Sequence, residues 1–260
     1  MVTSLVVHPG ASVDLAKRDP DSTPGAPGDR EHTEAVFEAQ HLRLAELQER
    51  LWAEGTRELL VVLQATDTAG KDGTIRHVFR GFNPSGTRVA TFRVPSELEA
   101  AHDFLWRVHS QVPRAGEVVV FNRSHYEDVL VTRVHGLVPP DVVSARYEHI
   151  NAFERLLHDA GTQIVKFLLH ISYEEQGKRL EERRTDPAKR WKYKESDLAE
   201  REHWDDYQAA FTAMLEKTST EHSRWHVIPS NHKWYRNWAV TEILLRALED
   251  MNPQYPTAAS

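Results

Sequence analysis

One stretch constrains the fold more than any other: residues 58–75, ELLVVLQATDTAGKDGTI. It begins with an almost uninterrupted apolar run at 58–64, which is typical of a strand covered on both faces of a parallel sheet. A loop of small and polar residues follows, and a helical pattern runs over about 71–80. A strand, a small-residue loop and a helix, in this order, are the setting that a phosphate-binding loop requires. The stretch therefore predicts an α/β protein that binds phosphate.

The loop residues suit an anion. Small residues, among them Ala65, let backbone N–H groups approach a phosphate, and the start of the following helix adds its positive dipole end. The lysine can bridge phosphate oxygens as a point charge. The alternative is a plain tight turn that carries a surface lysine. We expect phosphate to bind along Ala69, Gly70, Lys71, Asp72 and Gly73.

Two acids make this loop unusual. Ordinary phosphate loops place Ser or Thr directly after the lysine, where the hydroxyl binds a metal ion, but here Asp72 follows Lys71. The loop also contains Asp67. Because magnesium prefers carboxylates together with substrate phosphates, Asp67 is a candidate metal ligand. It is also a candidate base toward an attacking phosphate, or a cap for the N–H groups of the loop.

A second motif follows another apolar strand, in VVVFNRSHYEDVL (118–130). Polar residues at the carboxyl end of a strand reach the sheet edge where ligands bind in open α/β folds. Asn122 stands where ordinary phosphate-loop enzymes place a metal-binding Asp. Arg123 can grip a phosphate with two N–H groups, and Glu127 lies one turn further on. The alternative is a structural ion pair between Arg123 and Asp128.

The rest of the chain repeats the strand–helix alternation. Because strands that alternate with helices form parallel sheets, the sequence predicts the α/β class, with about five parallel strands and helices on both faces. Residues 1–30, rich in Pro, Gly and Asp, are predicted as an irregular arm, and 31–260 as a single domain. Further strands are expected at 88–94, 117–122, 163–171 and 225–230, and further helices at 31–54, 97–110, 126–136, 147–160, 172–184, 196–217 and 232–250.

Composition excludes several classes of protein. The net charge of −7 argues against a general nucleic-acid binder, which needs a basic face. The chain has no cysteine, which excludes disulfides and thiolate metal sites. No apolar run approaches a membrane span, so we expect a cytoplasmic protein without membrane contacts.

One segment departs from the acidic average. Residues 177–194, GKRLEERRTDPAKRWKYK, hold eight Lys or Arg against three acids. Alternating charges on a solvated helix are one explanation. A cationic surface that covers a phosphate chain is the other.

Three segments together resemble the polyphosphate kinase 2 family: ATDTAGKDGT, FNRSHYEDVL and ERRTDPAKRWKYKESDLAEREHWDDY. The resemblance covers about 30–250 and implies a three-layer phosphate-loop kinase fold with a helical lid over about 178–205. It implies that Asp67 and Lys71 bind the transferring phosphates and that Arg123 holds phosphate. The lid residues that would close over the phosphates are Arg183, Lys189, Arg190 and Lys192.

The resemblance also implies the reaction. Members move phosphoryl groups between inorganic polyphosphate and nucleotides with Mg²⁺ (Mn²⁺ as an alternative), and they assemble as homodimers or homotetramers. Many members carry Asp where this chain has Asn122. The combination of Asn122 with Glu127 resembles a subgroup that phosphorylates nucleoside mono- and diphosphates, and it leaves Asp67 and Glu127 as the candidate metal ligands.

The expected activity is therefore transfer from polyphosphate to AMP and ADP, with guanine nucleotides as further acceptors. An ATP-dependent nucleoside monophosphate kinase and a non-catalytic phosphate-loop protein are the alternatives.

Overall fold

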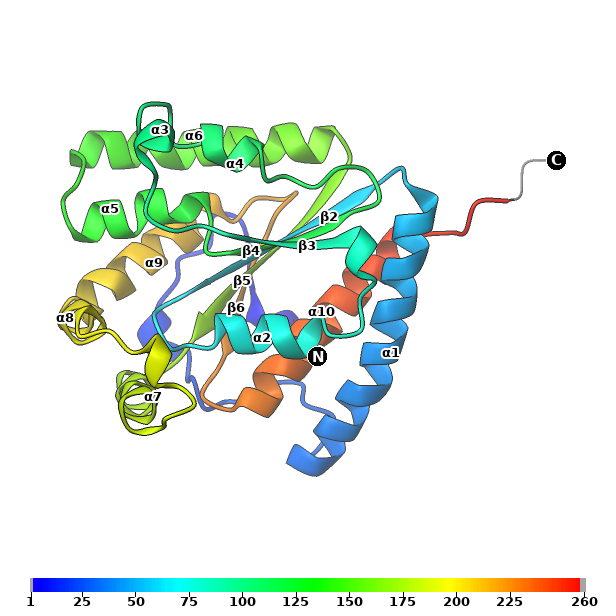
Figure 1. Ribbon diagram of the computed structural model, residues 1–260, viewed down its shortest axis with the longest axis horizontal. Helices are drawn as coiled ribbons and strands as arrows, with labels where there is room; N and C mark the ends of the chain where they lie inside the picture. The colour runs from blue at the N-terminus through cyan, green and yellow to red at the C-terminus, as the bar shows by residue number, and fades with distance from the viewer. Residues whose placement is uncertain (1, 258–260) are drawn as a thin grey trace.

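A single six-stranded sheet forms the centre of the computed structural model, which describes residues 2–257 (Figure 1). Five strands run parallel, as the sequence predicts, with β2 in the middle of them. In spatial order the strands are β1 (Val6–Val7), β6 (Trp225–Pro229), β5 (Thr162–His170), β2 (Glu58–Ala65), β4 (Val118–Asn122) and β3 (Thr87–Thr91).

The sixth strand comes from the predicted arm. Val6 and Val7 pair antiparallel with His226 and Trp225 at the edge of the sheet. Val7 is buried there, and two short 3₁₀-helices, Val2–Leu5 and Leu15–Lys17, flank the strand. A strand of two residues is too short to show the alternation from which strands are predicted. The arm therefore contributes to the sheet as well as covering it.

Helices cover both faces of the sheet (Figure 1). Side chains of β2 alternate between two apolar cores: Leu59 and Val61 face one, whereas Leu60 and Val62 face the other. This alternation within a wholly buried strand explains the uninterrupted apolar run. The first core is closed by α1 (Arg30–Glu54), α2 (Lys71–Val78) and α10 (Lys233–Met251), and the second by α4 (Trp106–His109), α6 (Pro140–Asp159) and α9 (Trp204–Thr218).

Several helix boundaries differ from the sequence prediction. Helix α6 begins at Pro140, seven residues earlier than the predicted 147, because its first turns are mostly exposed and so lack an apolar stripe. The predicted helix at 97–110 is two short helices, α3 (Glu97–Ala100) and α4. The remaining elements are 3₁₀-helices at Pro84–Gly86, His125–Val129 (η4) and Arg190–Lys192 (η5), and helices α5 (Val131–Val134), α7 (Tyr173–Thr185) and α8 (Ser196–Glu202).

The carboxyl ends of the central strands meet at one edge of the sheet. In the register of the ladder, Leu63 of β2 lies opposite Asn122 of β4, and Ala65 lies opposite Leu169 of β5. The phosphate loop and the second motif therefore emerge side by side. In the described residues, no helix combines the length and the apolar character that crossing a membrane demands.

Candidate active site

The phosphate loop joins β2 to α2 through two residues with left-handed backbones, Thr68 (φ 66°) and Gly70 (φ 109°). Gly70 caps α2 without a side-chain hydrogen bond. A Cβ atom at this position would lie 1.9 Å from Nη1 of Arg236, and one at Gly73 would lie 3.3 Å from Nη2. The backbone of Gly70 therefore favours glycine, and a side chain there would have to displace the guanidinium of Arg236.

Lys71 points back into the loop that precedes it. Its Nζ donates to the carbonyl oxygens of Ala65 at 2.8 Å and of Thr66 at 3.3 Å. Burial, together with the nearby Arg123 guanidinium, lowers the pKa of Lys71 to about 8, although Asp67 and other acids oppose this. The ammonium group is thus fixed at the loop and remains mostly charged at neutral pH.

Arg123 connects the two predicted carboxylates. Its Nη2 lies 2.7 Å from Oδ1 of Asp67, and its Nη1 lies 3.3 Å from Oε2 of Glu127. Burial pushes the pKa of Asp67 up, but Lys71, Arg123 and a lid arginine outweigh it, so the pKa lies below its ordinary value. The structure therefore brings Asp67, Lys71, Arg123 and Glu127 into one cluster of alternating charges.

The alternative pairing of Arg123 with Asp128 is wrong. Asp128 instead accepts from Arg146 of α6, at 3.3 Å. Arg123 is free to face the loop because its own backbone is left-handed (φ 62°) and its N–H donates to the carbonyl of Leu63. A non-glycine residue with such a backbone is uncommon and is typical of functional sites.

Asp72 and Asn122 contact each other. Nδ2 of Asn122 donates to Oδ1 of Asp72 at 3.1 Å, and Nζ of Lys192 lies 2.7 Å from Oδ2 of the same carboxylate. The two residues that depart from the usual phosphate-loop pattern are therefore hydrogen-bonded neighbours, and a lid cation joins them.

The four lid cations lie in different surroundings. Arg183 lies 3.5 Å from Asp197 and is near enough to Asp67 to lower the pKa of that carboxyl. Lys189 is exposed and pairs with Glu182 and Asp186, each at 3.2 Å. Arg190 is also exposed. Arg183 and Lys192 thus lie toward the loop, whereas Lys189 and Arg190 lie toward solvent.

Sequence reasoning missed two buried arginines. Arg179 of α7 donates to the carbonyls of Thr68 and Ala69 in the loop and to Ser230 and Asn231 after β6. Arg236, at the start of α10, packs against the glycines of α2. Arg179 belongs to the basic segment at 177–194, but nothing in that pattern separates a buried arginine from exposed ones.

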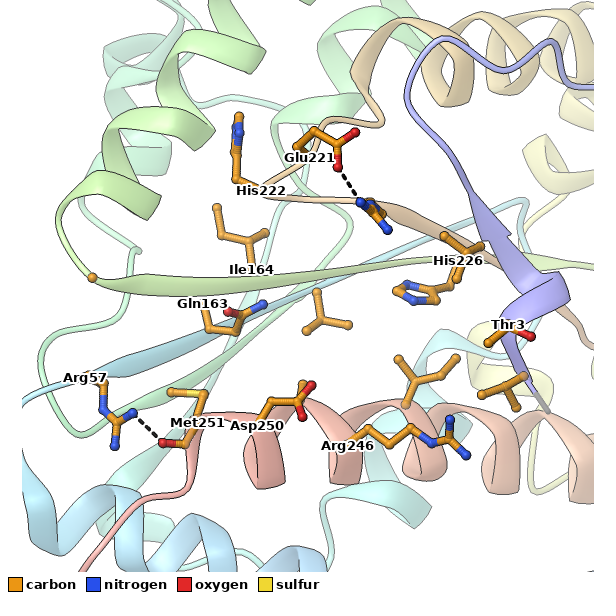
Figure 2. A pocket seen from close by; sticks show the side chains of 17 residues that line it. Thr3, Arg57, Gln163, Ile164, Glu221, His222, His226, Arg246, Asp250 and Met251 are labelled. Atoms are coloured by element: carbon orange, nitrogen blue, oxygen red, sulfur yellow. Dashed lines mark hydrogen bonds and ion pairs between the residues drawn. The ribbon is translucent and has the colours of Figure 1, made fainter.

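Two pockets of very different size lie at opposite ends of the strands. The one beside Asp67 encloses about 40 Å³ and is lined in part by Arg123, Glu127 and Tyr207. The other encloses about 660 Å³ near the amino ends of β5 and β6, and Figure 2 shows its lining from Arg57 and Gln163 to Arg246 and Asp250. In that larger pocket Arg224 pairs with Glu221, and the Arg57 guanidinium bonds the carbonyl of Met251. None of the predicted site residues lines it.

Among residues 2–257, no group of three or more His, Asp or Glu side chains is arranged to hold a metal ion. Asp67 and Glu127 are the two carboxylates that pair with Arg123 at this point. That number agrees with a magnesium ion that takes its other ligands from substrate phosphates and water.

A parallel sheet that delivers a lysine-bearing loop, an arginine and two carboxylates to one edge defines a phosphate-loop phosphotransferase. The family model described as polyphosphate kinase 2 matches residues 28–256. An AMP/ADP-polyphosphate phosphotransferase of Meiothermus ruber is 55% identical over 250 residues, which cover 96% of this chain and 94% of that protein. An ADP-polyphosphate phosphotransferase of Rhodopseudomonas palustris is 40% identical over 96% of this chain and 90% of its own length.

A solved structure agrees with these relatives. The crystal structure of polyphosphate kinase 2 from Arthrobacter aurescens superposes with a TM-score of 0.95 at 49% identity, covering 98% of this chain and 91% of that one. The chain belongs to the polyphosphate kinase 2 family, and it is a phosphotransferase. The predicted family and the predicted fold class are confirmed.

Proposed function

We propose that this protein transfers phosphoryl groups from inorganic polyphosphate to AMP and ADP, forming ADP and ATP. One observation carries the proposal: the cluster in which Arg123 bridges Asp67 and Glu127 beside Lys71, at the mouth of a phosphate loop. The name of the Meiothermus ruber relative supports AMP and ADP as acceptors. The names of relatives that act on GDP support guanine nucleotides as further acceptors.

The residues of the loop, the cluster and the lid have different expected roles. The loop N–H groups and Lys71 bind the donor phosphates, and Arg123 holds the phosphoryl group in line between donor and acceptor. Transfer of this kind depends mainly on positioning and on neutralising the charge of the equatorial oxygens. The lid at about 178–205 closes over the phosphates and excludes water, with Arg183 and Lys192 turned toward the loop.

Magnesium (Mn²⁺ as an alternative) fits the carboxylates of this cluster. Asp67 is the first candidate ligand and Glu127 the second, because both carboxylates line the pocket beside the loop and, among residues 2–257, each forms an ion pair with Arg123 alone. When bound, the ion would offset negative charge on the phosphates. Asn122 offers an amide instead of a carboxylate and is itself bonded to Asp72.

The direct test incubates the protein with long-chain polyphosphate, magnesium and AMP, ADP or GDP as separate acceptors, and follows the products by chromatography. We expect AMP to give ADP first and ATP later. A reaction with ATP and AMP but without polyphosphate would indicate the monophosphate kinase instead. Absence of product with every acceptor, while polyphosphate still binds, would indicate the non-catalytic alternative.

We further propose a cytoplasmic homodimer or homotetramer. The absence of cysteine suits a reducing compartment. Sedimentation equilibrium of the purified chain tests the assembly, and a single species at the 29.8 kDa of one chain would contradict it.

A further inference from the structure

A buried guanidinium group lies beneath the phosphate loop and, in the part of the chain that the structure describes, has no acidic partner. Arg236 is 2% exposed. Its hydrogen bonds within residues 2–257 go to the neighbouring amide alone: Nε and Nη2 lie 3.2 Å and 2.8 Å from Oδ1 of Asn237. The charged group that acts on it is a second cation, Arg179, and this repulsion adds to burial in lowering the pKa of Arg236 to about 9.

The group lies against the first turn of α2. Nη1 of Arg236 occupies the space that a side chain at Gly70 would need, and Nη2 lies against Gly73. Nη1 of Arg179 lies 3.8 Å from the same point at Gly70. Two guanidinium groups therefore flank the residue that caps the helix and ends the phosphate loop.

The two arginines differ in how their charge is balanced. Arg179 pairs with Glu175 at 2.7 Å and also bonds four carbonyl oxygens. Among residues 2–257, neither a carboxylate nor a backbone carbonyl accepts a hydrogen bond from Arg236. A buried charge without a partner is costly, so it persists in a fold only where something offsets the cost.

We propose that Arg236 is a positioning residue whose fixed positive charge is balanced by the phosphate chain bound at the loop. The inference rests on the proposed binding of polyphosphate at this loop. Arg236 does not reach the reacting atoms. It acts through the first turn of α2, by raising the positive potential that the loop N–H groups and Lys71 present to the anion.

A purely structural role makes the opposite prediction. If Arg236 only packs α10 against α2, removing its charge weakens the fold and leaves the affinity for phosphate chains unchanged. If the charge of Arg236 is instead balanced by the bound anion, a neutral side chain of similar length weakens anion binding. It leaves the ligand-free fold as stable as before or more stable.

The experiment measures the binding of tripolyphosphate by calorimetry and the thermal midpoint without ligand, for the wild type and for Arg236→Met and Arg236→Lys. Arg246→Met is the matched control, since Arg246 lies on the same helix, is exposed and pairs with Glu242. We expect Arg236→Met to weaken binding about tenfold, as loss of a nearby unit charge predicts. Its midpoint without ligand should not fall, and Arg236→Lys should stay within about threefold of the wild type.

Kinetics give a second readout. In Arg236→Met the KM for polyphosphate should rise about tenfold, while kcat at saturation changes by less than about threefold. Equal tripolyphosphate affinity in the wild type and in Arg236→Met would overturn the inference. A loss of affinity in Arg236→Lys as large as the loss in Arg236→Met would also overturn it. Failure of both Arg236→Met and Arg236→Gln to fold would also overturn the inference, because the charge of Arg236 would then be needed to stabilise the fold without ligand. If the wild type itself does not bind tripolyphosphate, the proposed function fails instead.

Discussion

The phosphate loop and the lid carry similar charges in opposite physical settings. At the loop, Lys71 bonds two backbone carbonyls and Arg123 pairs with two carboxylates, close to the carboxyl ends of the buried strands β2 and β4. In the lid, Lys189 is 48% exposed and pairs with acids of its own segment. Exposed ion pairs contribute little to stability, since water screens them, whereas groups at the loop are held in one geometry.

The difference indicates how one site can hold phosphates in a fixed position and still admit substrates. We propose that the loop fixes the position of the phosphates, because its groups are attached to the sheet. We propose that the exposed part of the lid opens. Arg179, near the start of the lid, bonds the loop carbonyls of Thr68 and Ala69. Beyond it, Lys192 bonds Asp72, and Arg183 bonds Asp197 within the lid itself. We therefore expect substitutions at the loop to abolish phosphoryl transfer and substitutions in the lid to lower kcat/KM by smaller amounts.

The largest effect is expected for Lys71→Ala and Asp67→Ala. Removing a charge that contacts the transferring phosphates should lower kcat/KM for polyphosphate by about a thousandfold, or about 4 kcal/mol. Circular dichroism should show an unchanged fold, because neither side chain belongs to the apolar cores. A loss of less than tenfold in either variant would remove the distinction between loop and lid.

A smaller effect is expected for Arg183→Ala. Because Arg183 is close enough to act on Asp67, its loss should raise the pKa of that carboxyl and lower kcat/KM by about 10–30-fold. Arg183→Lys should recover part of the activity. A loss of kcat/KM as large as that of Lys71→Ala would show that Arg183 contributes to transfer as much as the loop residues do.

The pH profile tests the burial of Lys71. Because its pKa lies near 8, the ammonium is charged below that pH and loses its charge as the pH rises through it. We expect kcat/KM for polyphosphate to fall about fivefold between pH 8 and pH 9. The profile of Lys189→Ala should follow that of the wild type, and a flat profile in both proteins would show that Lys71 keeps its charge.

The smallest effect is expected for Lys189→Ala. Its ammonium is exposed and paired locally, so kcat/KM should change by less than about twofold. Lys192→Ala, which removes the bond to Asp72, is the matched lid substitution and should cost more. Equal effects in initial-rate assays would mean that contact with the loop does not matter in the lid.

Much of the architecture followed from short patterns. The apolar run at 58–64 predicts a central buried strand, and the five parallel strands were found where the pattern places them. The helix from Arg30 to Glu54 ends at Gly55, as its left-handed backbone requires. By contrast, β1 has two residues, and its place depends on β6, which lies more than two hundred residues away.

By itself, the sequence determined the order of strand, loop and helix and the chemistry carried by Asp67, Lys71 and Arg123, because these depend on neighbours within a few residues. Only the tertiary structure decided which charges meet. Arg123 pairs with Asp67 and Glu127 instead of Asp128, and Lys192 reaches Asp72 across 120 residues. Arg236 lies beneath Gly70 because α10 packs beside α2. Such contacts depend on how distant elements pack, and local periodicity does not record that packing.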